Sequence, residues 1–192
     1  VWYGILGCGG VYHTVNPRLF PDQIAYIINH AEDRVLFTDL TFVPLLEKIA
    51  DRLPTIERYI VLSDAAHMPD TSLKGALAYE DWIAGLDGDY AWKEVDERAA
   101  AGMCYTSGTT GNPKGVVYSH RSNVLHSMAA LQADMLGLSS NDVVLPVVPM
   151  FHANGWSLAF GAPMIGAKCV MPGARMDGAS IHELLESEGV TC

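Results

Sequence analysis

Hydrophobic residues in the first part of the chain alternate between helical and extended spacing. After Pro21 they follow helical spacing, and we expect one helix face made of Ile24, Ile27, Ile28 and Ala31. The segment 34–39 contains three successive apolar residues at 35–37 and predicts a short buried strand. Residues 42–49 repeat the helical spacing behind Thr41 as candidate N-cap. Another apolar run at 59–62 predicts a second strand. Because strands that alternate with helices form parallel sheets, this order predicts a parallel sheet covered by helices.

A stretch rich in Asp, Gly, Pro and Ser at 63–96 interrupts the alternation and predicts a connector. We expect a short helix within the connector at 79–84. After the connector we expect three strands, at 101–105, 143–145 and 168–171. We also expect three helices there, one that opens at Ser119, one at 156–165 and one at 181–187 capped by Asp177. The helix after Ser119 should extend to residue 136, with an apolar side made of Val124, Leu125, Met128, Leu131 and Met135. The expected fold class is α/β, with mostly parallel sheets flanked by helices. Its sub-regions would be 1–62 and 97–192, on either side of the connector.

The most informative segment is a loop rich in glycine and hydroxyl groups between two apolar runs. It reads T-S-G-T-T-G-N-P-K-G from Thr106 to Gly115. Glycines let backbone N–H groups approach an anion closely, and serine and threonine hydroxyls donate further hydrogen bonds. Lys114 adds a mobile positive charge, and Pro113 fixes the direction in which it leaves the loop. The sequence therefore predicts a grip for nucleotide phosphates, made of Thr106, Ser107, Gly108, Thr109, Thr110, Gly111 and Lys114.

This loop does not have the spacing of the common P-loop. The pattern G-x-x-x-x-G-K-[ST] requires a second glycine five positions after Gly108, where this chain has Pro113. Typical P-loop chemistry is therefore not the natural interpretation. A polar surface loop without a ligand is the alternative, and single hydroxyls could bond only the loop's own backbone.

The loop resembles the signature of the acyl-adenylate-forming enzymes, which include acyl-CoA synthetases, luciferases and peptide-synthetase adenylation domains. A second segment agrees, because P-M-F-H-A-N-G-W at 149–156 looks like that of medium- and long-chain fatty acyl-CoA synthetases. The upstream segment Y-H-T-V-N-P-R-L at 12–19 is similar to the corresponding segment of these synthetases as well. The resemblance covers nearly the whole chain. It implies part of the large N-terminal, AMP-binding domain of an acyl-CoA synthetase-like fold.

The resemblance also implies roles for residues of both segments. Thr106 would help to hold Mg²⁺, and Lys114 would be a catalytic residue that contacts the β- or γ-phosphate of ATP, or a residue that stabilises the loop. His152 would act through its position or charge near the reacting carboxylate and the α-phosphate. The backbone of Ala153 would line the same wall, and Trp156 would gate an acyl tunnel. Without the resemblance, His152 and Trp156 would be interpreted as core residues.

The implied reaction activates a fatty acid with ATP, first to acyl-AMP and then, with coenzyme A, to acyl-CoA. Fatty acid, ATP and coenzyme A would be the substrates, and Mg²⁺ the cofactor. The family's adenine, ribose and late lysine motifs have no match here, and the chain begins without methionine inside an apolar segment. We therefore expect a fragment that needs the missing C-terminal part of the enzyme and has little or no ligase activity alone. A non-catalytic phosphate-binding module, or another adenylating enzyme for aryl or amino acids, are the alternatives.

Composition narrows the expected partners and compartment. The chain has 192 residues, of which 12 are basic and 22 acidic, and its net charge is −10. Without a cluster of Lys or Arg, nucleic acid is not an expected partner. No apolar run reaches the roughly 20 residues that span a bilayer, and the four cysteines lack metal-binding spacing. We expect a cytoplasmic enzyme, with peripheral membrane association left open and a homodimer as in some related synthetases.

Overall fold

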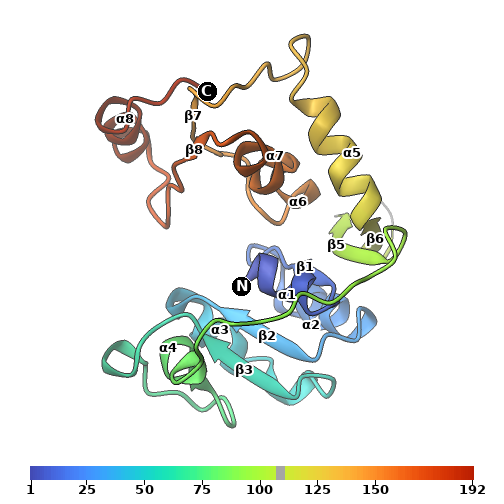
Figure 1. The fold of residues 1–192 in the computed structure, drawn as a ribbon. Helices are drawn as coiled ribbons and strands as arrows, with labels where there is room; N and C mark the ends of the chain where they lie inside the picture. The colour runs from blue at the N-terminus through green and yellow to red at the C-terminus, as the bar shows by residue number, and fades with distance from the viewer. Residues whose placement is uncertain (107–110) are drawn as a thin grey trace. The chain divides into compact units, whose positions relative to one another are not determined.

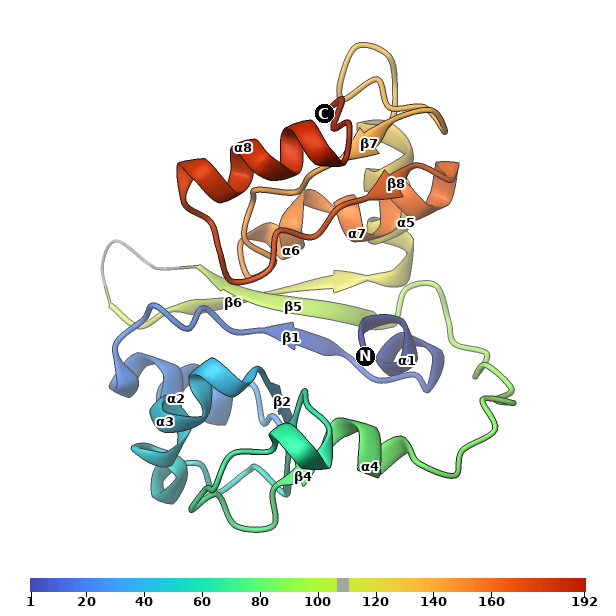
Figure 2. The ribbon, with the colours of Figure 1, turned by 90° about the vertical axis from the view of Figure 1, so that its left-hand side faces the viewer.

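The computed structural model describes residues 1–106 and 111–192 and has an α/β fold (Figures 1 and 2). One sheet has the order β1-β5-β6 and consists of Tyr12–Thr14, Ala100–Thr106 and Lys114–Ser119. A second has the order β2-β3-β4 and consists of Val35–Thr38, Arg58–Val61 and Leu77–Ala78. A third pairs β7, Val143–Val144, with β8, Lys168–Cys169. The pairs β1–β5, β2–β3, β3–β4 and β7–β8 are parallel, which confirms the predicted fold class.

The chain divides into two compact units. The first unit comprises Val1–Thr14, Lys93–Cys104 and Val116–Cys192, and the second comprises Val15–Trp92 and Tyr105–Gly115. Most of the expected connector therefore folds with the residues before it, because β4 extends the sheet of β2 and β3. The division of the domain into sub-regions at 1–62 and 97–192 stays a prediction.

The second unit is built around helix α2 (Pro21–His30). The helix begins where the sequence predicts, since Pro21 occupies the first turn, in which a backbone N–H has no intrahelical partner. The short helix α4 (Tyr79–Ile83) also forms where expected. The three isoleucines of the predicted face pack into the core, whereas Ala31 lies just after the helix and is partly buried. The buried core consists of Ile24, Ala25, Ile27, Ile28, Val43, Leu46, Ile49, Leu53, Tyr59, Val61 and Leu73.

The predicted N-cap at Thr41 is wrong. Asp39 is the capping residue, and its Oδ1 accepts hydrogen bonds from the backbone N and the hydroxyl of Thr41 at 2.9 and 2.8 Å. Residues Leu40–Phe42 form a 3₁₀ turn, and helix α3 (Val43–Glu47) starts only after it. A charged acceptor at Asp39 satisfies the first free N–H groups better than a hydroxyl, and this moves the start of the turn two residues earlier.

In the first unit, helix α5 (His120–Ala130) follows β6 directly. Ser119 caps it as predicted, because its Oγ accepts a hydrogen bond from the backbone N of Ser122 at 3.1 Å. The helix ends six residues before the predicted end at 136, and its predicted apolar side is wrong. The buried face consists of Asn123, Ser127 and Ala130, whereas Val124, Leu125, Met128 and Met135 are exposed. Leu131, just after the helix, is partly buried against the core, as predicted.

Hydrogen bonds explain why polar residues of α5 face inward. The amide nitrogen of Asn123 donates to the hydroxyl of Tyr12 at 3.3 Å, and the hydroxyl of Ser127 donates to the Asn123 carbonyl at 2.8 Å. Buried polar groups that find partners lose their desolvation penalty, so they can take the inner face of a helix. Burial also raises the pKa of Tyr12 to about 12.

Three further helical segments of the first unit follow β7 along the chain. Helix α8 (Gly178–Ser187) is capped by Asp177 as predicted. The Asp177 carboxylate accepts hydrogen bonds from the backbone N of Ala179 and of Ser180. The helix expected at 156–165 begins at Leu158 instead, as α7 (Leu158–Ile165), after a separate turn labelled α6 (Ala153–Trp156). A small cluster of Leu138, Val144, Ala162 and Ala167 fills the centre. Within the described residues, no helix is long and apolar enough to cross a membrane.

Candidate functional site

The base of the predicted phosphate loop is formed by the end of β5 and the start of β6. Thr106 is exposed at the end of β5, and its hydroxyl donates to the Lys114 carbonyl at 3.5 Å. Gly111 and Lys114 are exposed, whereas Pro113 is buried. The two ends of the loop are therefore held together while the candidate ligands face solvent.

The structure describes only part of the predicted phosphate grip. Thr106, Gly111 and Lys114 are described, and Ser107, Gly108, Thr109 and Thr110 lie outside the described residues. Gly111 has a φ angle of 89°, in the left-handed region that glycine adopts without strain. Among the residues that the structure covers, the Lys114 ammonium has no ion-pair partner, so its charge is available to an anion.

A hydrogen bond supports the strand that leads into this loop. The hydroxyl of Tyr105 lies 2.7 Å from Nδ1 of His30, which ends α2, and the two rings meet edge to face at a centroid distance of 5.8 Å. Tyr26 packs against the other side of the contact, with 5.3 Å between its ring centroid and that of His30. Burial, and then the charges of Asp33 and Tyr26, raise the pKa of Tyr105. The Tyr105 hydroxyl therefore stays a neutral hydrogen-bonding group next to Thr106.

The second predicted segment forms a left-handed turn. His152 precedes α6 and is exposed, as is Ala153. Trp156 is 51% exposed, so its indole is not a core residue of this unit. Thr106 and Lys114 meet at the base of one loop, and His152, Ala153 and Trp156 share one turn. The catalytic role of His152, the backbone contact of Ala153 and the gating role of Trp156 stay predictions.

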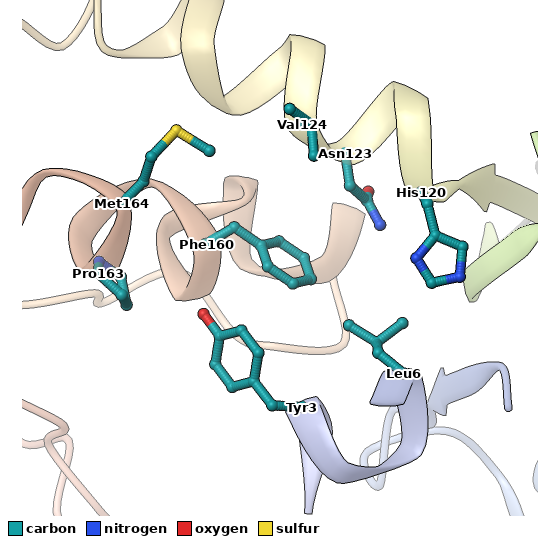
Figure 3. Close-up of a pocket in the computed structure, with 8 residues that line it drawn as sticks. All are labelled: Tyr3, Leu6, His120, Asn123, Val124, Phe160, Pro163 and Met164. Atoms are coloured by element: carbon teal, nitrogen blue, oxygen red, sulfur yellow. The ribbon is translucent and has the colours of Figure 1, made fainter. Parts of the chain in front are cut away.

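An apolar cavity of about 460 Å³ lies in the first unit (Figure 3). Its walls come from helix α1 (Trp2–Gly7), α5 and α7, with Tyr3, Leu6, His120, Asn123, Val124, Phe160, Pro163 and Met164 as lining residues. The hydroxyl of Tyr3 donates to the carbonyl of Ala159, which joins α1 to α7. The volume lies within the range of small-molecule sites. Sequence reasoning missed this cavity, because none of its three helices carries a motif for it.

One polar atom at the cavity stands out. Figure 3 shows the His120 ring beside Leu6 and Asn123, and its Nε2 is buried without a hydrogen-bond partner in the described part of the chain. Each buried group of this kind costs stability unless something satisfies it. The cavity is therefore mostly apolar, with one unsatisfied polar atom at its wall.

The described residues contain no cluster of three or more His, Cys, Asp or Glu that could hold a metal ion. The Thr106 hydroxyl is the one predicted metal ligand, and a single neutral oxygen does not hold Mg²⁺ alone. Mg²⁺ in nucleotide sites typically takes most of its ligands from phosphate oxygens and water. The fit is therefore to a metal that arrives with a nucleotide, and no preformed ion site is required.

Two curated proteins that the chain resembles cover it almost completely. It is 51% identical over 191 residues to the medium-chain-fatty-acid–CoA ligase of Ectopseudomonas oleovorans, and the aligned region covers 100% of this chain and 35% of that protein. It is 52% identical over 190 residues to the long-chain-fatty-acid–CoA ligase of Thermus thermophilus, and the aligned region covers 99% of this chain and 34% of that protein. The chain thus spans about a third of the length of these relatives.

The fold agrees with the sequence relatives. The structure of an anthranilate CoA ligase in complex with anthranoyl-AMP aligns with a TM-score of 0.78 and 25% identity, over 96% of this chain and 35% of that one. The profile of the AMP-binding enzymes matches residues 1–192, the whole chain. Because the family match includes the loop base, the turn at His152 and all three sheets, the chain belongs to the AMP-binding enzyme family.

Proposed function

We propose that the full-length protein containing this chain is a fatty-acid–CoA ligase that forms AMP. The loop base supports this proposal, because Thr106 and Lys114 are both exposed there and the Thr106 hydroxyl bonds the backbone carbonyl of Lys114. The Lys114 ammonium has no ion-pair partner within residues 1–106 and 111–192. An anion with several oxygens is the ligand that such a pair fits. The identities of about 50% to two fatty-acid–CoA ligases support the reaction type.

The proposed reaction has two steps. A carboxylate oxygen of the fatty acid attacks the α-phosphorus of ATP, and the bond to the β-phosphate oxygen breaks, so that acyl-AMP and pyrophosphate form. The thiol sulfur of coenzyme A then attacks the acyl carbon; its proton is lost to solvent, and AMP leaves with the bonding electron pair. The protein's contribution to the first step is to position the reactants and to stabilise charge on the phosphates.

The loop residues would act on the departing pyrophosphate. Lys114 would hold the β- or γ-phosphate, and Thr106 would donate to a phosphate oxygen or contribute one ligand to Mg²⁺. Ser107, Gly108, Thr109, Thr110 and Gly111 would complete the grip with hydroxyl and backbone N–H groups. Mg²⁺, when bound with ATP, supplies charge neutralisation to the phosphates. The enzyme's own residues orient the chain of phosphates for attack.

The turn of the first unit would receive the other substrate. His152 would orient the carboxylate by hydrogen bonding or charge, the Ala153 backbone would line the same wall, and Trp156 would cover the entrance for the acyl chain. The apolar cavity of α1, α5 and α7 supports a fatty substrate, because α7 begins directly after this turn and most lining residues are apolar. Mg²⁺, ATP and coenzyme A are the cofactor and co-substrates of this proposal.

Incubation of the full-length enzyme with octanoate, ATP, Mg²⁺ and coenzyme A tests the proposal. We expect AMP, pyrophosphate and octanoyl-CoA in equal amounts. Preference for an amino acid or an aryl acid, measured in the same assay over a panel of carboxylates, would instead identify another adenylating enzyme. Formation of ADP would contradict the proposal outright.

The isolated chain tests the alternative of a non-catalytic phosphate-binding module. Calorimetric titration with ATP and with pyrophosphate measures binding, and a ligase assay on the same sample measures chemistry. We expect at most binding, because loss of one preorganised charge-stabilising group alone costs about 10²–10³ in rate. Turnover by the isolated chain near that of the full-length enzyme would contradict its dependence on the missing C-terminal part.

Compartment and assembly are further parts of the proposal. All four cysteines are free, which is typical of proteins in a reducing compartment, so we place the enzyme in the cytoplasm. Homodimerisation is a separate prediction, which light scattering on the full-length enzyme tests. A monomeric mass would contradict the predicted homodimer and would leave the proposed reaction unaffected.

A further inference from the structure

The side chain of Asn154 connects the left-handed turn to two strands of the β1-β5-β6 sheet. Its Nδ2 donates to Oγ1 of Thr14 at 3.0 Å and to the Met103 carbonyl at 3.4 Å. Thr14 ends β1, and Met103 lies in β5 opposite His13. Because a carbonyl can only accept, the contact with Met103 identifies the amide nitrogen as the atom that faces the sheet. The amide therefore joins the turn to residues 140 and 51 positions away in the sequence.

This connection is shielded from solvent. Asn154 is 3% exposed, so water does not compete well for its two hydrogen bonds. Its second amide atom, Oδ1, is buried without a hydrogen-bond partner among residues 1–106 and 111–192. A buried acceptor without a partner lowers stability. The amide therefore makes its bonds to the sheet through Nδ2, while Oδ1 has no partner among the described residues.

The backbone on both sides of Asn154 is strained. Positive φ angles occur in five consecutive residues, which are Ala153 at 41°, Asn154 at 48°, Gly155 at 65°, Trp156 at 56° and Ser157 at 59°. Glycine, and to a lesser degree asparagine, tolerates this region, whereas alanine, serine and tryptophan do not. Such a run persists only where surrounding contacts determine it. The bonds of Asn154 are contacts of this kind at the centre of the run.

Gly155 adds a second restraint next to Asn154. A Cβ built on Gly155 would lie 2.6 Å from Sδ of Met150, so the turn folds back closely onto the residues before it. His152 and Trp156 lie on either side of this restrained pair. Relaxation of the turn to right-handed dihedrals would change the direction of both side chains.

The geometry points to Asn154 as a positioning residue for the carboxylate-binding turn. Through Thr14 and Met103 it holds the left-handed backbone that sets the directions of His152 and Trp156, and it does not itself touch the substrate. This inference rests on the proposed function, because it takes His152 and Trp156 as the residues that meet the fatty acid.

Four variants of the full-length enzyme test the inference. Asn154→Gly keeps the freedom to adopt positive φ and removes the amide, and Thr14→Val removes the acceptor hydroxyl in a similar volume. Thr14→Ser restores the hydroxyl. Thr55→Val is the matched control, because its partly buried hydroxyl bonds Asn29 in the other unit at 3.4 Å.

The readout is the Michaelis constant for octanoate compared with that for ATP. We expect Thr14→Val to raise KM for octanoate about three- to tenfold, as loss of one hydrogen bond predicts. Asn154→Gly, which loses both hydrogen bonds, should raise it at least as much. KM for ATP should change less than about twofold in either variant. The double variant Asn154→Gly/Thr14→Val should be no worse than Asn154→Gly, because Asn154→Gly already removes the contact with Thr14. Thr14→Ser and Thr55→Val should resemble the wild type.

Three outcomes separate this inference from the proposed function. A wild-type enzyme that is inactive on every carboxylate overturns the proposed function. An active wild type whose Asn154→Gly and Thr14→Val variants show unchanged KM for octanoate, with or without a lower melting temperature, overturns the positioning role alone. If Asn154→Gly does not fold, the contrast between Thr14→Val and Thr14→Ser still decides.

Discussion

The Tyr105 hydroxyl lies 2.7 Å from Nδ1 of His30, so that the residue before the phosphate loop is bonded to the last residue of α2. Tyr105 also packs against the core of the second unit, whose buried centre includes three isoleucines of α2. The end of β5 is thus fixed in two ways, by ring packing and by a polar contact. Thr106 follows immediately and inherits this restraint through the backbone.

Replacement of Tyr105 by phenylalanine separates these two restraints. The ring and its packing remain, and the bond to His30 is lost. We expect the affinity of the full-length enzyme for Mg-ATP to fall about two- to fivefold, the effect of one partly exposed hydrogen bond. Tyr90→Phe, at a residue that is 59% exposed, is the control. Equal affinities for the wild type and Tyr105→Phe would show that ring packing alone positions Thr106.

Lys114 should contribute more than Tyr105, because its ammonium meets a charged ligand directly. Lys114→Ala is expected to weaken pyrophosphate binding by about 10- to 100-fold at low salt, in line with a charge-assisted hydrogen bond. The difference from the wild type should shrink as ionic strength rises. Lys74→Ala removes an exposed lysine of the same unit and serves as control. Calorimetry measures both, and a similar loss for the two variants would contradict a specific contact.

Gly102 is a close-packing position of β5, opposite Tyr12 of β1. A Cβ on Gly102 would lie 2.2 Å from Cζ of Tyr12, a residue that is 3% exposed and whose ring packs against that of Trp2 with 4.0 Å between centroids. Gly102→Ala should therefore lower the free energy of unfolding by about 1–3 kcal/mol or more. Gly4→Ala, in helix α1 with nothing within 4 Å of the new methyl group, should leave it unchanged or raise it slightly. Urea unfolding of both variants checks this contrast.

The carboxylate of Glu47 makes the stability of the second unit depend on pH. Its Oε1 accepts hydrogen bonds from the backbone N of Ser72 at 2.7 Å, the hydroxyl of Thr71 at 2.8 Å and the hydroxyl of Ser72 at 3.2 Å. These bonds, with that of the Ser72 backbone largest, lower the pKa of Glu47 below its ordinary value of 4.5. A lowered folded-state pKa stabilises the protein above the unfolded value, and this contribution is lost as the pH falls through the folded value.

The Glu47→Gln variant measures that contribution. Between about pH 7 and about pH 5 the variant should be less stable than the wild type, and the difference should shrink as the pH falls below about 4.5. Glu94→Gln, at an exposed carboxylate without a hydrogen bond in the described residues, is the control. Urea midpoints across this pH range give the comparison. A constant difference at every pH would mean that Glu47 acts through packing.

Much of the local structure could be predicted from the sequence. Helix α2 and its buried face followed from the spacing of isoleucines behind Pro21, and the caps at Ser119 and Asp177 followed from their side chains. These features depend on neighbours within about one or two helical turns, whose chemistry is readable along the chain. The loop at 106–115 and the segment at 149–156 could likewise be identified as candidate sites from short-range composition.

The face of α5 and the turn at Asn154 could not be predicted in the same way. Spacing favoured Val124 and Leu125 as the inner side, but the bond from Asn123 to Tyr12 turned a polar face inward. A run of positive φ angles is locally unfavourable, so no propensity indicates it. In the structure Asn154 bonds Thr14 and Met103, and Gly155 packs closely against Met150. The sequence by itself determined α2, the caps at Ser119 and Asp177, the family and the candidate phosphate loop, whereas α1, β1 and β4 were not predicted from it. The tertiary structure decided which side chains face inward and how the turn of His152 is held, because both depend on partners far away in the chain.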